Sequence, residues 1–135
     1  MKICMVGLGI GKTHGAFVGG HINNVVNLSK KLGEDGYEVH IVTTPPIHHD
    51  SSFRDSEMSE INSNVFFHQV KVRGDFINAN LNYGIRSIAK MLLEIRKLHR
   101  EEKFDVIHGH SGFPPIALIP EIVGIFSDVF SMHTL

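Results

Sequence analysis

The sequence is poor in several features that would have narrowed its function at once. Its 135 residues include one cysteine, Cys4, and no tryptophan, and the formal net charge is only −1. A single thiol excludes a disulfide framework and a cysteine-based zinc site, and balanced charge gives no electrostatic reason to expect a nucleic-acid partner. No run approaches the roughly 20 apolar residues that a membrane-spanning helix needs. These absences favour a soluble cytoplasmic protein.

What the chain does have is enough apolar material for a core. Hydrophobic residues make up 42% of it and charged residues 20%, a balance typical of globular domains. The length predicts a single domain that spans residues 1–135. Ten histidines make the net charge depend on pH near neutrality.

Apolar runs alternate with helical patterns along the whole chain. The spacing predicts strands over 2–8, 38–44, 65–72, 104–110 and 127–135, and helices over 20–33, 82–102 and 114–124. Within the last helix, Pro120 should kink or shorten the element. Strands that alternate with helices imply right-handed crossovers. The expected fold is therefore an α/β, Rossmann-like three-layer sandwich with a mainly parallel, doubly wound sheet.

Each of the two long helices shows an apolar stripe, and one carries many cations. The first stripe is Ile22, Val25, Val26, Ser29 and Leu32. In the helix over 82–102 the predicted stripe is Ile85, Ile88, Ala89, Leu92, Ile95 and Leu98 or His99. Cations flank that stripe, and they fit either a solvated face of a crossover helix or a helix that rests on an anionic membrane; they are Arg86, Lys90, Arg96, Lys97 and Arg100.

The stretch VGLGIGKTHGAFVGGH, residues 6–21, resembles two phosphate-binding motifs and matches neither. A P-loop would need glycine at Val6, and a dinucleotide fingerprint would need glycine at Lys12. The fingerprint would also need an acidic residue after the second strand, where Thr43 and Thr44 stand. A stand-alone nucleotide- or dinucleotide-binding module that uses the loop Gly7–Thr13 remains an alternative hypothesis.

Ligands of doubly wound sheets bind outside the carboxyl ends of the strands. His108 and His110 share one face of a strand, and with His133 on a neighbouring strand they could form a three-histidine zinc site. The competing interpretation is that these strand-end histidines are satisfied by backbone groups. A nucleophile triad at Ser111 would lack the G-x-S-x-G elbow.

Four blocks of the sequence together resemble the amino-terminal half of a retaining family-4 glycosyltransferase with the GT-B fold. They are MKICMVG, GGHINNVVNLSKKLGEDGYEVHIVTT, FDVIHGHS and FSMHT, in this order and with the family's spacing. The resemblance covers nearly the whole chain. It implies that the glycine pair Gly19 and Gly20 approaches the donor phosphates. It also implies a catalytic His133 beside the transferred sugar and an acceptor side formed by Lys12, Thr13, His14, His110 and Ser111.

The resemblance also implies a reaction. The complete enzyme would transfer a hexose from a nucleotide diphosphate sugar, such as a UDP- or GDP-hexose, to a sugar or lipid acceptor with retention of configuration. It would need no metal ion and no other cofactor. The family's carboxyl-terminal nucleotide-sugar domain is absent from this sequence, so we expect little turnover from the chain alone. An apolar face that the second domain would cover favours a dimer, and a lipid acceptor would favour peripheral contact with the inner face of the membrane.

Overall fold

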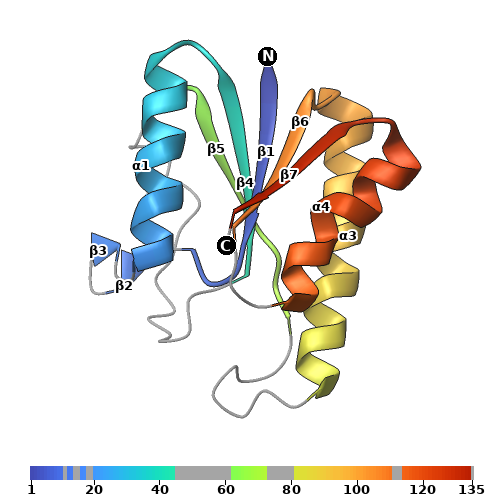
Figure 1. Ribbon diagram of the computed structural model, residues 1–135. Coiled ribbons are helices and arrows are strands. Elements are labelled where there is room, and N and C mark those ends of the chain that lie inside the picture. The colour runs from blue at the N-terminus through green and yellow to red at the C-terminus, as the bar shows by residue number, and fades with distance from the viewer. Residues whose placement is uncertain are drawn as a thin grey trace.

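The computed structural model describes residues 1–10, 12–13, 16–17, 20–44, 62–72, 81–110 and 114–134. Its centre is a five-stranded sheet of order β5-β4-β1-β6-β7, in which all neighbours run parallel (Figure 1). The doubly wound topology is confirmed, because successive strands are added first on one side of β1 and then on the other. The strands are β1 (Lys2–Gly7), β4 (Glu38–Thr43), β5 (Val65–Gln69), β6 (Val106–His110) and β7 (Phe130–Thr134).

Helices cover both faces of the sheet, which confirms the three-layer sandwich. Helix α1 (Gly20–Glu34) lies on one face, and α3 (Leu81–Glu102) and α4 (Pro114–Ser127) lie on the other (Figure 1). Alternate residues of β1 pack into two separate hydrophobic cores, one on each face of the sheet. Ile3 and Met5 pack with the α1 layer, whereas Cys4 and Val6 pack with the α3 and α4 layer.

Helix α1 follows its sequence pattern closely. Val25, Val26 and Ser29 are buried, and Ile22 and Leu32 are partly buried. The helix ends in a Schellman motif, in which the Tyr37 N–H donates to the Leu32 carbonyl at 3.0 Å and the Gly36 N–H donates to the Gly33 carbonyl at 3.1 Å. Gly36 has φ of 89°, a conformation that glycine adopts without a steric penalty.

The apolar stripe predicted for α3 is wrong at two positions. Ile85 is 55% exposed and Ala89 is also exposed, whereas Met91, absent from the predicted stripe, is fully buried. The helix presents Met91, Ile95 and Leu98 to the sheet, with Ile88 and Leu92 partly buried beside them. The helix carries two overlapping apolar rows, and packing against the sheet selects one of them.

Two expectations for α4 are also wrong. The helix continues through Pro120 and past Gly124 to Ser127, whereas the sequence predicted a helix shortened by the proline and stopped at the glycine. Pro120 is buried, and its Cγ would lie 2.7 Å from a Cβ at Gly109 of β6. Gly124 lies where a Cβ would be 3.1 Å from the Ser131 Oγ of β7. The absence of a side chain at Gly109 and at Gly124 therefore allows α4 to pack closely on the sheet.

Adding a methyl group at Gly109 should destabilise the fold. A Cβ there would meet Pro120 Cγ at 2.7 Å and His133 Cδ2 at 3.2 Å, so Gly109→Ala should cost about 1–3 kcal/mol through overpacking. Gly84→Ala in α3 is the matched control, since nothing lies within 4 Å of its Cβ position. We expect that control to gain up to about 1 kcal/mol in helix propensity. Urea unfolding of both variants measures the two free energies, and equal effects would contradict the packing described here.

Candidate functional site

The candidate site lies at the carboxyl edge of the sheet, where α1 begins and β7 ends (Figure 1). Gly20 is the first residue of α1, His110 is the last of β6, and His133 lies one residue before the end of β7. Lys12 and Thr13 form β2, which pairs antiparallel with β3 (Ala16–Phe17), a short hairpin that sequence reasoning missed. Three further residues assigned to the site, Gly19, His14 and Ser111, lie outside the described residues.

Two buried threonines hold the start of the glycine-rich loop against the end of β4. The Gly9 N–H donates to the Thr44 Oγ1 at 3.0 Å, and the Ile10 N–H donates to the Thr43 Oγ1 at 2.8 Å. The Thr43 hydroxyl in turn donates to the Thr44 carbonyl at 3.1 Å. Buried N–H groups need such partners. The two threonines therefore fix the path by which the chain leaves β1.

Ile10 fills the space above the end of β1. Its side chain is fully buried, and its Cδ1 lies 2.6 Å from where a Cβ at Gly7 would be. Glycine at position 7 is therefore what lets Ile10 fold back over the strand. The alternative of a phosphate-binding loop over Gly7–Thr13 loses support, because such a loop needs free backbone N–H groups, and those of Gly9 and Ile10 are already bound to threonine hydroxyls.

A chain of polar side chains runs along the α1 side of β6. His110 Nε2 lies 3.2 Å from His108 Nδ1, and His108 Nε2 lies 2.7 Å from the Thr134 Oγ1 of β7. Both histidines are 7% exposed, and their ring centroids are 3.9 Å apart. Burial, and next the charge of nearby His133, lower the pKa of His108. A neutral His108 carries one N–H, so its partners determine which nitrogen of each ring holds a proton.

His133 lies on the opposite face of the sheet from His108 and His110. It pairs in register with Gly109, and paired residues of parallel strands project to the same face. In agreement, its Cδ2 would lie 3.2 Å from a Cβ at Gly109, on the side where Pro120 of α4 packs. The three-histidine zinc hypothesis is therefore wrong, since the sheet separates one ring from the other two. The alternation within HGH was readable in the sequence, but the register of β7 against β6 was not.

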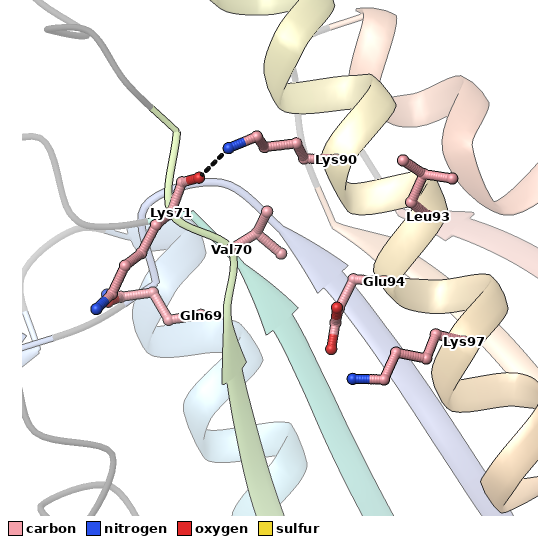
Figure 2. Close-up of a pocket in the computed structure, with 7 residues that line it drawn as sticks. All are labelled: Gln69, Val70, Lys71, Lys90, Leu93, Glu94 and Lys97. Carbon is pink, nitrogen blue, oxygen red and sulfur yellow. Dashed lines mark hydrogen bonds between the residues drawn. The ribbon is translucent and has the colours of Figure 1, made fainter.

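A shallow cleft of about 460 Å³ lies beside the edge strand β5 and against α3 (Figure 2). Lys90 reaches across it, and its Nζ donates to the Lys71 carbonyl at 2.8 Å. The side chains of Lys90 and Lys97 bring two ammonium groups to the cleft against one carboxylate, that of Glu94, whereas the Lys71 side chain points away from α3 (Figure 2). The cleft is therefore cationic, and sequence reasoning did not identify it because its two walls are about 20 residues apart in the chain. It is lined by Gln69, Val70, Lys71, Lys90, Leu93, Glu94 and Lys97.

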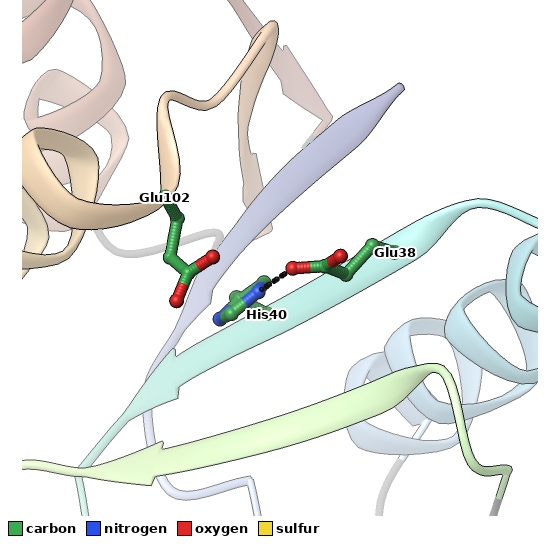
Figure 3. Close-up of side chains that lie close together, drawn as sticks. All are labelled: Glu38, His40 and Glu102. Atoms are coloured by element: carbon green, nitrogen blue, oxygen red, sulfur yellow. Dashed lines mark hydrogen bonds and ion pairs between the residues drawn. The ribbon is translucent and has the colours of Figure 1, made fainter.

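A second polar cluster lies at the opposite, amino edge of the sheet (Figure 3). Glu38, His40 and Glu102 have ligand-type atoms within 4.8 Å of one another, a spacing that a metal ion could bridge. The Lys2 ammonium already lies between the two carboxylates, 3.1 Å from Glu38 Oε1 and 2.6 Å from Glu102 Oε2. Lysine thus supplies the positive charge that a metal would bring, and we interpret the cluster as structural.

His40 is held from both sides within this cluster. Its Nε2 lies 2.9 Å from Glu38 Oε1, and its Nδ1 lies 2.9 Å from His68 Nε2 on the edge strand. The hydrogen bond with His40, and next the one from Lys2, lower the pKa of Glu38. Hydrogen bonds to Glu102 and Glu38 raise the pKa of Lys2. The cluster joins the starts of β1 and β4 to the end of α3.

The buried His108 should make folding weaker in acid. Its pKa lies below the ordinary value of 6.5, so the unfolded chain binds its proton more readily than the folded one. The neutral His108 ring contributes its full stability above pH 6.5. That contribution decreases as the pH falls from 6.5 through the lower pKa of the folded state. We expect His108→Gln to flatten this part of the stability profile, measured by urea unfolding across the pH range. A His108 ring signal that titrates above 6.5 in long-range ¹H–¹⁵N NMR spectra would contradict the burial effect.

Removing the Lys2 ammonium should raise the pKa of Glu38 and destabilise the fold near neutral pH. A carboxylate whose pKa is lowered in the folded state contributes stability above its unfolded value of 4.5, and that contribution is lost as the pH falls through the folded pKa. The melting-temperature deficit of Lys2→Met should therefore shrink as the pH falls below that value. Lys31→Met, which removes an exposed pair with Asp35, is the control. A deficit that stays constant with pH would contradict the ion-pair role.

No curated protein sequence matches the chain. Among solved structures, the C-terminal domain of PF1911 hydrogenase from Pyrococcus furiosus superposes with a TM-score of 0.66 at 15% identity, covering 98% of this chain and 90% of that one. MurG from Acinetobacter baumannii gives 0.59 at 17%, and the kitacinnamycin glycotransferase gives 0.61 at 16%. At such identities the likeness establishes the fold alone.

The sequence identifies a protein family, whereas the structural likeness identifies only a fold. The superpositions on MurG and on the kitacinnamycin glycotransferase each cover 98% of this chain. They cover 34% of the MurG chain and 29% of the glycotransferase chain. No helix in the described ranges combines the length and apolarity needed to cross a bilayer. The model of Glycosyltransferase Family 4 matches residues 18–135, a segment that includes α1, β6 and β7. Three of the four sequence blocks lie within this match, which confirms the family resemblance, and the chain belongs to Glycosyltransferase Family 4.

Proposed function

We propose that the chain forms the acceptor-side wall of a retaining glycosyltransferase. The reaction transfers a hexose from a nucleotide diphosphate sugar to a sugar or lipid acceptor in the cytoplasm, without a metal ion. The acceptor hydroxyl loses its proton, its oxygen bonds to the anomeric carbon, and the nucleotide diphosphate leaves with the electrons of the broken bond. The observation that carries the proposal is the family match over residues 18–135, which includes the residues assigned to the site on α1, β6 and β7.

The donor phosphates would bind at the start of α1. A helix N-terminus presents unpaired backbone N–H groups and partial positive charge. Helix α1 begins at Gly20 and has no acidic residue in its first turn, so no carboxylate there opposes an anionic ligand. Gly20, with Gly19 before it in sequence, lets a phosphate approach the backbone closely. Such fixed donors stabilise a leaving diphosphate without reorganising during the reaction.

The acceptor would meet the α1 side of β6 and the hairpin of β2 and β3. His110 ends β6 on that side and is bound to His108, so its ring is oriented before a ligand arrives. Lys12 and Thr13 form β2, and His14 and Ser111 are their proposed neighbours at the acceptor. An oriented imidazole and a lysine suit an acceptor with hydroxyl or phosphate groups.

His133 would contact the transferred sugar from the opposite face of the sheet. Its neighbour in register, Gly109, leaves room for the ring because it has no side chain. A second domain, of the kind that the family resemblance implies, would close over this edge and supply most of the nucleotide site. Closure of that kind excludes water, which would otherwise hydrolyse the donor.

Titration of the chain with nucleotide sugars tests the proposed function. UDP-glucose and GDP-mannose should shift the backbone NMR signals of Gly20, His110 and His133, and they should bind weakly because the 135 residues span 34% of the MurG chain and 29% of the glycotransferase chain that they match. NADH and magnesium-ATP are the matched comparison for the alternative nucleotide-binding module. Shifts at Gly9 and Ile10 with either of those ligands, and none with sugar nucleotides, would overturn the proposal. His133→Gln should weaken sugar-nucleotide binding about fivefold, the equivalent of one hydrogen bond of about 1 kcal/mol.

A further inference from the structure

The solvent-facing side of α3 carries an unbroken cationic and apolar surface. Successive helical residues are about 100° apart, which places eight exposed residues within an arc of about 140° that contains no aspartate or glutamate. We call this surface the α3 outer face. Its members are Ile85, Arg86, Ala89, Lys90, Leu93, Arg96, Lys97 and Arg100.

The acidic residues of α3 lie outside this arc. Glu94 and Glu101 lie beyond its border, and Glu102 is bound to Lys2 at the amino edge. Among the described residues, no salt bridge neutralises Arg86, Arg96 or any other cation of the α3 outer face. Five positive charges therefore act together on one side of the molecule.

Two large apolar side chains are exposed among these cations. Ile85 is 55% exposed and Leu93 is 67% exposed, and Leu93 lies near the middle of the arc. Single exposed apolar residues are common on protein surfaces. Here they alternate with cations whose long alkyl stems can lie along an apolar phase while their charged ends reach its boundary.

The cationic cleft borders the α3 outer face on the β5 side (Figure 2). Lys90, Leu93 and Lys97 belong to both features. The positive surface therefore continues from a convex helix into a hollow of about 460 Å³. A negatively charged headgroup would find there the ammonium groups of Lys90 and Lys97 and a single carboxylate, that of Glu94.

We propose that the α3 outer face binds the surface of an anionic lipid bilayer. Headgroup phosphates complement the five cations, and the boundary of the acyl chains complements Ile85 and Leu93. A soluble polyanion would satisfy the cations but would leave the two apolar side chains in water. The sequence left two interpretations of this helix open, and the exposure of Ile85 and Leu93 selects between them. This surface is separate from the residues of the proposed reaction.

Co-sedimentation with lipid vesicles tests the proposal. The 135-residue chain should bind vesicles of phosphatidylcholine mixed with phosphatidylglycerol and should not bind phosphatidylcholine alone. Arg96→Gln with Arg100→Gln should weaken binding roughly thirtyfold, about fivefold for each charge lost near the surface. Leu93→Asn should weaken it roughly tenfold because an apolar side chain no longer leaves water. All three positions are exposed, so circular dichroism melts should match the wild type.

The control removes the same charge from the other layer of the molecule. Lys30→Gln with Lys31→Gln on α1 changes the net charge equally, and its vesicle binding should equal that of the wild type. Failure of the wild type to bind anionic vesicles, or equal losses in the α1 control, would overturn the proposal. Unchanged vesicle binding by Leu93→Asn would also overturn it, because charge alone would then carry the binding and the face would not distinguish a bilayer from a soluble polyanion. None of these results depends on sugar-nucleotide binding, so the two proposals fail independently.

Discussion

The burial of β1 on both faces is the constraint from which the rest of the structure follows. Cys4, Met5 and Val6 are fully buried, and their strand pairs with β4 on one side and β6 on the other. Such a strand is stable only between two helical layers, because each face must be removed from water. With β1 at the centre and every neighbour parallel, the carboxyl ends of all strands meet at one edge, where the glycine-rich loop also begins.

The amino and carboxyl edges of the sheet differ in how their polar groups are paired. At the amino edge, ionic side chains are paired with one another: Lys2 lies between Glu38 and Glu102, and His40 bridges Glu38 to His68. At the carboxyl edge, Thr43 and Thr44 bind the first N–H groups of the loop. The polar contacts at the amino edge therefore hold β1, β4, β5 and the end of α3 together. The opposite edge, which in this fold is the usual place for ligands, carries the residues that the family resemblance assigns to the reaction.

Sequence periodicity predicted the buried face of a helix correctly where the helix has a single apolar face. The buried stripe of α1 was predicted correctly, since only one face of that helix is apolar. In α3 two apolar rows overlap, and Ile85 was assigned to the core although it is exposed. In α4 the cost of Pro120 is offset by its packing on Gly109, a contact between segments distant in the chain. Helix propensities describe only residues that are near in sequence and do not include such contacts. They therefore predicted too short a helix for α4.

The sequence by itself determined the order of strands and helices, the parallel sheet and the family, because these depend on local propensity and on motifs read along the chain. Tertiary structure decided which side chains meet. The register of β7 on β6 separates His133 from His108 and His110. Ile10 folds back over Gly7 at the end of β1, and the rotation of α3 exposes Leu93 among cations. The physical reason is common to all three, since close packing selects one arrangement among several that the local pattern permits.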